Sequence, residues 1–272
     1  MITLNKASSL VVASAAVAMA AIAGAGVAQA DGYQGRAAPV AAPWNWSGLY
    51  FGVHSGWAWS ETNGFFPDGN PALTIAGVAN QGFSTTTDAP IVGGQIGLQH
   101  QFGALVVGIE GGLSSTYQTK VGSDLCPKVT IATFNCTARL ENVLTLGGRL
   151  GWSMGKWMPY VTGGYASARF EEEVTNRSLA PIGASIIRYG GSRDNGWYVG
   201  GGFDIAMAHG WTIGLDYKHF EFDSNDKPAS AVVGGVWNAL PNDNARFDSN
   251  ADILSLRVSW KLGRVETVAP LK

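Results

Sequence analysis

The sequence has little charge, two cysteines and no long apolar run after its first thirty residues. Charged residues make up 14% of the 272 residues, against about 25% in an average soluble domain, which argues against a charged disordered chain or a coiled coil. The net charge of −2 excludes the basic surface that nucleic-acid binding needs. Phosphate-binding loops, dinucleotide fingerprints and CxxC pairs are also lacking. The chain is instead rich in glycine and tryptophan, with 37 and 10 residues. This composition suggests a β-protein whose outer surface does not face water.

Residues 1–30 have the pattern of a secretory signal peptide. Lys6 is their only charge, an almost wholly apolar run spans residues 10–27, and Ala28-Gln29-Ala30 precedes the polar Asp31. This pattern predicts export and cleavage after Ala30. A retained membrane anchor is the alternative, because the run is nearly long enough to span a bilayer. We interpret residues 31–45 as a flexible periplasmic leader.

Residues 46–263 alternate apolar and polar side chains, which is the period of β-strands. The clearest case spans residues 140–152, where Leu140, Leu144 and Leu146 share one parity and Arg149 has the other. Segments at 105–110, 211–218 and 254–261 follow the same pattern. Segments at about 47–60, 89–101, 157–171 and 195–208 follow it less cleanly. Eight strands are therefore expected.

The connections between these strands alternate in length. Short ones fall near residues 102–103, 154–156 and 208–210, and long ones span 61–88, 119–136, 173–194 and 224–248. Alternating turns and an even strand number are typical of outer-membrane barrels, and closure removes the sheet edges that lipid cannot satisfy. The sequence predicts an all-β fold, an eight-stranded antiparallel up-and-down transmembrane β-barrel over residues 46–263, with a C-terminal tail at 264–272.

The charged parity must face the barrel interior, because a charge on the lipid face near the bilayer centre costs about 2–4 kcal/mol. An eight-stranded barrel is just wide enough for side chains to fill, so opposite charges are expected to pair across it. The predicted interior charge network consists of Glu110, Arg139, Glu141, Arg149, Asp204, Asp216, Lys218, Arg257 and Lys261. Ser55 and Asn142 fall on the lipid-facing parity, which a bulge or a position near the rim would explain.

Tryptophans gather at both ends of the predicted strands, where interfacial aromatic girdles are required. The predicted lipid-interface aromatics are Trp46, Trp152, Trp157, Trp211 and Trp260 at the short turns, and Trp57, Trp59 and Trp197 toward the long loops.

The segment from Trp46 to Trp57 resembles the first strand of the porin-like outer-membrane immunogenic proteins of Gram-negative bacteria. Residues 93–97, 107–110, 159–164 and 211–217 resemble later strands of that family, so that the resemblance spans about 44–263. It implies an OmpA-type barrel at the cell surface, often antigenic, with members described as structural, porin-like or haem-binding. Members commonly end on a Phe that the barrel-assembly machinery recognises, whereas Leu262 stands at that place here.

Two cysteines lie in the second predicted long loop. Because export leads to an oxidising compartment, Cys126 and Cys136 are predicted to form a disulfide. A metal pair or two free thiols are the alternatives. Glu171-Glu172-Glu173 begins the third long loop and is interpreted as a solvated rim, with divalent-cation binding as the alternative.

The four histidines are dispersed over different predicted strands and turns, unlike the clustered ligands of zinc or the accessible axial ligand of haem. We expect His54, His100, His209 and His219 to be solvated or hydrogen-bonded. His219 with Glu221 and Ser224 is the only local set that resembles a lipid-modifying enzyme. Catalytic, cofactor-binding and metal sites are not expected, and neither is enzymatic activity.

Three functions remain open: a structural and surface protein, a narrow and weakly selective pore, and a receptor that binds a ligand such as haem through its loops. The expected location is the outer membrane. The expected partners are outer-membrane lipid and lipopolysaccharide, the barrel-assembly machinery, and host or surface partners of the long loops.

Overall fold

The computed structural model describes residues 44–66, 81–117, 134–176, 186–189, 193–233 and 236–262. All of them belong to one compact unit, residues 42–269. The predictions for the signal peptide, most of the leader and the C-terminal tail lie outside the described residues. Within the described residues, no helix has the length and apolar character needed to cross a membrane.

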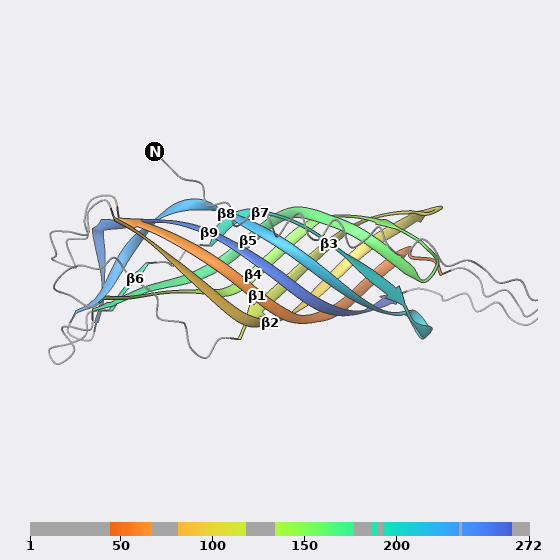
Figure 1. Cartoon of the computed structure of the whole chain (residues 1–272), viewed down its shortest axis with the longest axis horizontal. Coiled ribbons are helices and arrows are strands. Elements are labelled where there is room, and N and C mark those ends of the chain that lie inside the picture. The colour runs from red at the N-terminus through yellow and green to blue at the C-terminus, as the bar shows by residue number, and fades with distance from the viewer. Residues whose placement is uncertain are drawn as a thin grey trace, which may run out of the picture. The chain divides into compact units, whose positions relative to one another are not determined.

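Nine strands follow one another along the chain. They are β1 (Gly48–Phe66), β2 (Gln81–Phe102), β3 (Leu105–Thr116), β4 (Phe134–Trp152), β5 (Trp157–Asn176), β6 (Ile186–Tyr189), β7 (Asp194–Ala206), β8 (Trp211–Val233) and β9 (Val236–Leu262). Eight of these strands pair antiparallel with their neighbours, and β9 pairs with β1 to close the barrel (Figure 1). The short β6 pairs with β5 and β8. The predicted eight-stranded antiparallel barrel is confirmed.

The short connections are tight turns that use the left-handed backbone region. Gly103 (φ 63°) joins β2 to β3, and Gly155 (φ 70°) joins β4 to β5. The 3-10 turn η3 (Ala208–Gly210) joins β7 to β8, with His209 at φ 60°. These turns coincide with the predicted short connections.

The strands reach far into the segments predicted as long loops. β8 continues to Val233 and β9 restarts at Val236, so most of residues 224–248 form one hairpin. Sequence reasoning missed this extension because the alternation reverses along the long strands such as β8. On β8, apolar Trp211 and Ile213 are exposed near the short turns, whereas farther along Glu221 is exposed and Phe222 is buried.

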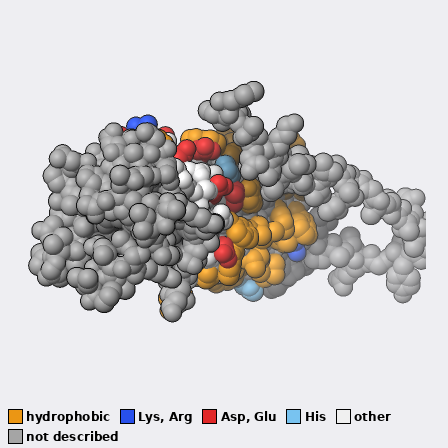
Figure 2. Space-filling model, turned by 60° about the vertical axis from the view of Figure 1, so that its left-hand side comes forward, with side chains coloured by type: hydrophobic (Ala, Val, Ile, Leu, Met, Phe, Trp, Pro, Cys, Tyr) orange, Lys and Arg blue, Asp and Glu red, His pale blue; other side chains and the backbone are white. Residues whose placement is uncertain are grey.

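This reversal divides the barrel into two sections. In the membrane section the exterior is apolar and the interior polar; it comprises residues 48–59, 89–102, 105–116, 143–152, 157–165, 197–206, 211–218 and 253–262. In the surface section, the remaining described parts of the strands, the exterior is mainly polar. The interior there combines apolar side chains such as Phe170, Phe220 and Phe222 with buried polar ones such as Thr62, Glu172 and Lys227. Figure 2 shows the apolar belt on one side of the barrel, bordered by Asp and Glu side chains. The ten residues of β9 in the membrane section match the about 9–11 that a tilted strand needs to cross lipid.

A β-bulge in β4 corrects the predicted interior set. The register shifts between Leu140 and Asn142, and both Leu140 and Val143 are buried. One extra residue exchanges the two faces of the strand. Leu140 therefore faces the interior rather than lipid, and Arg139, which donates to Glu171, lies on the outer face.

Exposed tryptophans flank the apolar belt at the predicted positions, with one exception. Trp57, Trp59, Trp152, Trp157, Trp197 and Trp211 are exposed, and Trp260 packs edge-on against Phe51. Trp46 is only 1% exposed. Its assignment to the lipid interface is wrong, because the chain turns into the lumen before β1 begins.

Candidate functional site

The end of the lumen at the short turns is filled by Trp46. Its indole Nε1 donates to Gly155 O (3.3 Å), and its own carbonyl accepts from Gln99 Nε2 (2.8 Å). The residues buried with it are Val106, Met158 and Ala206, against which Trp44 also packs. Gly48, with φ 134°, starts β1 immediately after this inward turn. The N-terminal end of the barrel domain is thus a plug on the lumen axis.

Above this plug lies a buried network of three carboxylates and three cations. Arg257 is at its centre, with Nη2 at 2.6 Å from Glu110 Oε2 and Nη1 at 3.4 Å from Asp216 Oδ2. Arg149 pairs with Asp204, and both are nearly fully buried. Lys218 Nζ lies 2.9 Å from Asp216 Oδ2 and so completes the set.

Two tyrosines hold these ions in place. Tyr50 donates to Glu110 Oε2 (2.7 Å), and the Arg149 guanidinium carbon lies 3.6 Å from the centre of the Tyr160 ring. The chain makes room for such long side chains with glycine: a Cβ on Gly97 would come within 2.4 Å of the Tyr50 ring. Sequence reasoning did not include Tyr50 and Tyr160 in the interior network, although each lies at an inward-facing position of its strand.

Six of the nine predicted network residues meet in this cluster: Glu110, Arg149, Asp204, Asp216, Lys218 and Arg257. Lys261 lies apart, where its Nζ donates to Asn45 O and sits 5.1 Å from the centre of the Trp44 ring. Arg139 and Glu141 do not reach the lumen, because the β4 bulge carries them toward Glu171 and Arg169 on the outer face.

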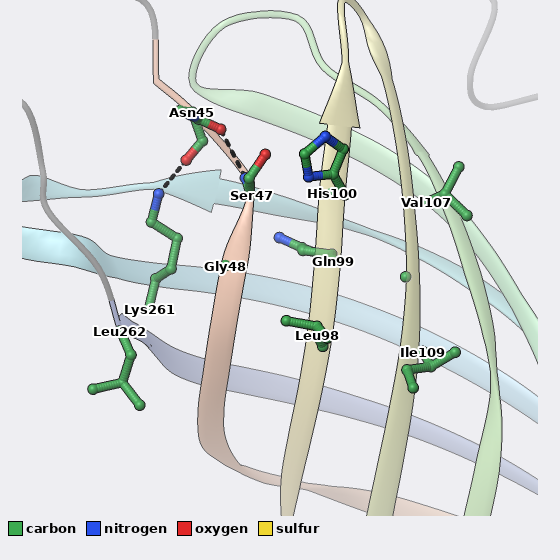
Figure 3. Close-up of a pocket in the computed structure, with 11 residues that line it drawn as sticks. Asn45, Ser47, Gly48, Leu98, Gln99, His100, Val107, Ile109, Lys261 and Leu262 are labelled. Carbon is green, nitrogen blue, oxygen red and sulfur yellow. Dashed lines mark hydrogen bonds between the residues drawn. The ribbon is translucent and has the colours of Figure 1, made fainter.

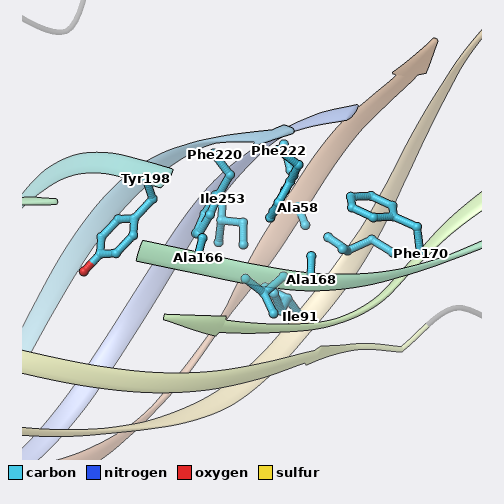
Figure 4. Packing of buried hydrophobic residues seen from close by; sticks show 12 residues of the cluster. Ala58, Ile91, Ala166, Ala168, Phe170, Tyr198, Phe220, Phe222 and Ile253 are labelled. Atoms are coloured by element: carbon cyan, nitrogen blue, oxygen red, sulfur yellow. The ribbon is translucent and has the colours of Figure 1, made fainter. Parts of the chain in front are cut away.

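An apolar layer closes the lumen above the ionic network (Figure 4). Phe170 from β5 meets Phe222 from β8 edge-on at 5.3 Å, and Phe220 stacks on Phe222 and Tyr198. The smaller members of the layer are Ala58, Ile91, Leu140, Val143, Ala166, Ala168, Ala251 and Ile253. The layer spans the boundary between the two sections: Ala58, Ile91, Val143, Tyr198 and Ile253 lie in the membrane section, and the phenylalanines lie in the surface section.

A second buried ionic site lies in the surface section, where sequence analysis predicted a solvated rim. Lys227 is 1% exposed and its Nζ contacts Glu172 Oε1 (2.6 Å) and Asp194 Oδ2 (2.7 Å). Glu172 is thus buried, which corrects the rim interpretation. Its Oε2 is buried without a hydrogen-bond partner. Burial raises the pKa of Glu172 to about 7, although Lys227 opposes the shift.

The histidines form no shared site. Both ring nitrogens of His54 have partners, Gln95 (2.6 Å) and Ser114 (2.8 Å). His219 lies on the outer face, with Nδ1 2.8 Å from Asp252 Oδ1 and Nε2 3.6 Å from Glu221 Oε2, and no hydrogen bond joins it to Ser224. Among the described residues no group of three or more metal-ligating side chains gathers.

The predicted disulfide stays a prediction. Cys126 lies outside the described residues, and only the backbone of Cys136 is described, in β4.

The comparisons with known proteins agree with this architecture. A family model described as the outer membrane protein beta-barrel domain matches residues 9–261. The chain belongs to this family. As an outer-membrane barrel, the protein has its apolar belt in lipid and its surface section outside the membrane. No curated protein matches its sequence significantly.

Solved structures similar to this outer-membrane barrel include the outer membrane protease OmpT of Escherichia coli, with 9% identity, a TM-score of 0.45 and coverage of 82% of this chain and 98% of that one. OprG of Pseudomonas aeruginosa has 11% identity, a TM-score of 0.41 and coverage of 79% and 97%. Neisserial surface protein A has 12% identity, a TM-score of 0.33 and coverage of 79% and 98%.

Proposed function

We propose that this protein is a sealed outer-membrane barrel whose role is structural and surface-directed, and that it is neither a pore nor an enzyme. The filled lumen carries the proposal. The Trp46 plug, the ionic network and the apolar phenylalanine layer follow one another across the described barrel. Between the plug and Arg149 there is a cavity of about 10 Å³, which is room for no more than about one water molecule.

The ionic network itself opposes conduction. Its three cations and three carboxylates already neutralise one another at contact distance. An ion that entered would have to displace a buried pair, which leaves its partner uncompensated in a low-dielectric interior. The same balanced pairing stabilises the barrel as a scaffold for the surface section.

Single-channel recording in planar bilayers tests this proposal. Wild-type protein, shown to be inserted by its heat-modifiable gel mobility, is expected to give no discrete conductance steps. A porin of known conductance, recorded in the same bilayers, is the positive control. Stable conductance of the wild type would overturn the sealed-barrel function in favour of the narrow pore.

The surface section supports the proposed partners. Its exterior carries charged side chains just beyond the apolar belt, among them Arg169 and Glu221, whose side chains are 51% and 52% exposed. We propose that these groups contact lipopolysaccharide head groups, and that residues of the predicted long loops contact host or surface partners. We also propose export with cleavage after Ala30 and insertion by the barrel-assembly machinery. Mass measurement of the mature chain, expected to begin at Asp31, checks the cleavage.

A further inference from the structure

At the periplasmic end of the barrel, β2 extends beyond the end of its neighbour β1. The last pair between β1 and β2 is Gly48 with Gln99, and the last pair between β1 and β9 is Leu49 with Leu262. β2 continues to Phe102. Beyond these pairs β1 does not continue as a strand: residues 44–47 turn inward beside the last residues of β2, where Gln101 N donates to Ser47 Oγ and Gln101 Oε1 accepts from Trp46 N. A groove of about 600 Å³ occupies this place (Figure 3).

One part of the groove is apolar and faces lipid. Leu98, Ile109 and Leu262 line it, and their side chains are 54%, 61% and 39% exposed on the outer face. They belong to three different strands. Leu98 is paired with Ile109, and the exposed Leu49 of β1 lies between Leu98 and Leu262, so that together they form an apolar wall beside the groove. Such a wall suits acyl chains.

The other part of the groove holds a buried cation that has no carboxylate partner among the described residues. Lys261 is 8% exposed, and its Nζ donates to Asn45 O (Figure 3). Within the described residues, no carboxylate lies within ion-pair distance of this ammonium. Lys218 and Lys227, in contrast, each contact a carboxylate. An ammonium has three donors, and a buried charge without a counter-ion is costly. The Lys261 ammonium is therefore suited to bind an anion as its counter-ion.

A buried acceptor lies in the same groove. Gln99 is 7% exposed and its Nε2 is used by Trp46 O, but its Oε1 is buried without a hydrogen-bond partner. A ligand that places a hydroxyl or an ammonium beside its phosphate would satisfy this oxygen as well as Lys261.

The height of the groove identifies the class of ligand. Lys261 follows Trp260 in the periplasmic aromatic row, which marks the interface between acyl chains and water. We propose that the groove binds one glycerophospholipid of the inner leaflet. Its phosphate contacts Lys261, a head-group donor reaches Gln99 Oε1, and an acyl chain lies along Leu98, Ile109 and Leu262. This site does not depend on whether the lumen conducts.

Native mass spectrometry of delipidated protein, titrated with phosphatidylglycerol, tests the site. Wild type is expected to bind one phosphatidylglycerol in preference to diacylglycerol, which lacks the phosphate, and to inorganic phosphate, which lacks the chains. Lys261→Gln is expected to bind about tenfold more weakly, because charge-assisted hydrogen bonds are lost. The matched control is Lys156→Gln, an exposed lysine in the turn between β4 and β5 at the same end of the barrel, and it is expected to bind as wild type does.

Heat-modifiable gel mobility of each sample verifies folding. Ile109→Ala provides a second variant, because this exposed side chain contributes to the groove wall without contacting the ionic interior; it is expected to weaken binding while the mobility stays unchanged. Equal phosphatidylglycerol binding by wild type, Lys261→Gln and Ile109→Ala would overturn the proposal. So would equal binding of diacylglycerol, or no retained phospholipid in wild type.

Discussion

Individual charged residues in this barrel contribute very differently to stability, according to whether they are buried or exposed. Arg257 contacts Glu110 and Asp216 inside the lumen, whereas Arg246 makes a two-pronged contact with Asp226 in water. Removing one partner of a buried pair leaves an uncompensated ion, while an exposed pair contributes little. The same residue type thus has two different energetic roles.

We predict that Arg257→Met lowers the free energy of unfolding by about 3–5 kcal/mol, because three carboxylates then share two cations. Arg246→Met is the control and should leave stability unchanged. Equilibrium urea unfolding of the folded barrel in lipid vesicles measures both. Equal destabilisation by the two substitutions would contradict the assigned network.

Glu172 gives the surface section a pH dependence. Its pKa is about 7 in the folded protein, against about 4.3 in an unfolded chain. Between these values the folded state binds more protons than the unfolded state, so stability falls as pH rises through this window. The cause is burial beside Asp194, with a single ammonium, Lys227, between the two carboxylates.

We therefore expect the urea midpoint to be higher at about pH 5.5 than at about pH 8, and Glu172→Gln to remove most of the difference. Glu61→Gln, which changes an exposed carboxylate on β1, is the matched control. A pH dependence that persists in Glu172→Gln would assign it to another group.

At the scale of one strand, the point where the outward-facing side chains change from apolar to polar marks the boundary of the membrane. On β9, Leu256 is 63% exposed in the membrane section, whereas Asn250 lies on the same outer parity in the surface section. An outward charge is costly only where the surroundings are lipid. The alternation along the strand therefore shows which part of it has lipid on its outer face and which part has water.

Leu256→Arg is predicted to destabilise the barrel by about 2–4 kcal/mol, while Asn250→Arg should have little effect. Urea unfolding measures the difference. Spin labels at the same two positions provide an independent readout: position 256 should be reached by lipid-soluble quenchers and position 250 by aqueous ones. An aqueous-accessible label at position 256 would reject the assigned membrane section.

At the scale of the whole molecule, the barrel behaves as a closed wall filled along its axis. An eight-stranded barrel has an interior only wide enough for side chains, and here those side chains change from an indole plug to paired ions and then to phenyl rings. The proposed lipid groove lies beside β1 at the periplasmic end. It opens toward lipid and supports a lipid contact rather than a passage through the membrane.

The sequence by itself determined the strand number, the short turns, the closed topology and most of the inward charges, because a two-residue period and the cost of charge in lipid are local and strong. Tertiary structure decided the rest. The extra residue near Glu141 shifts one face of β4, the inward turn before Gly48 buries Trp46, and Glu172 meets Lys227 only when β5 and β8 approach. Each outcome depends on contacts between segments far apart in the chain, which a local period does not encode.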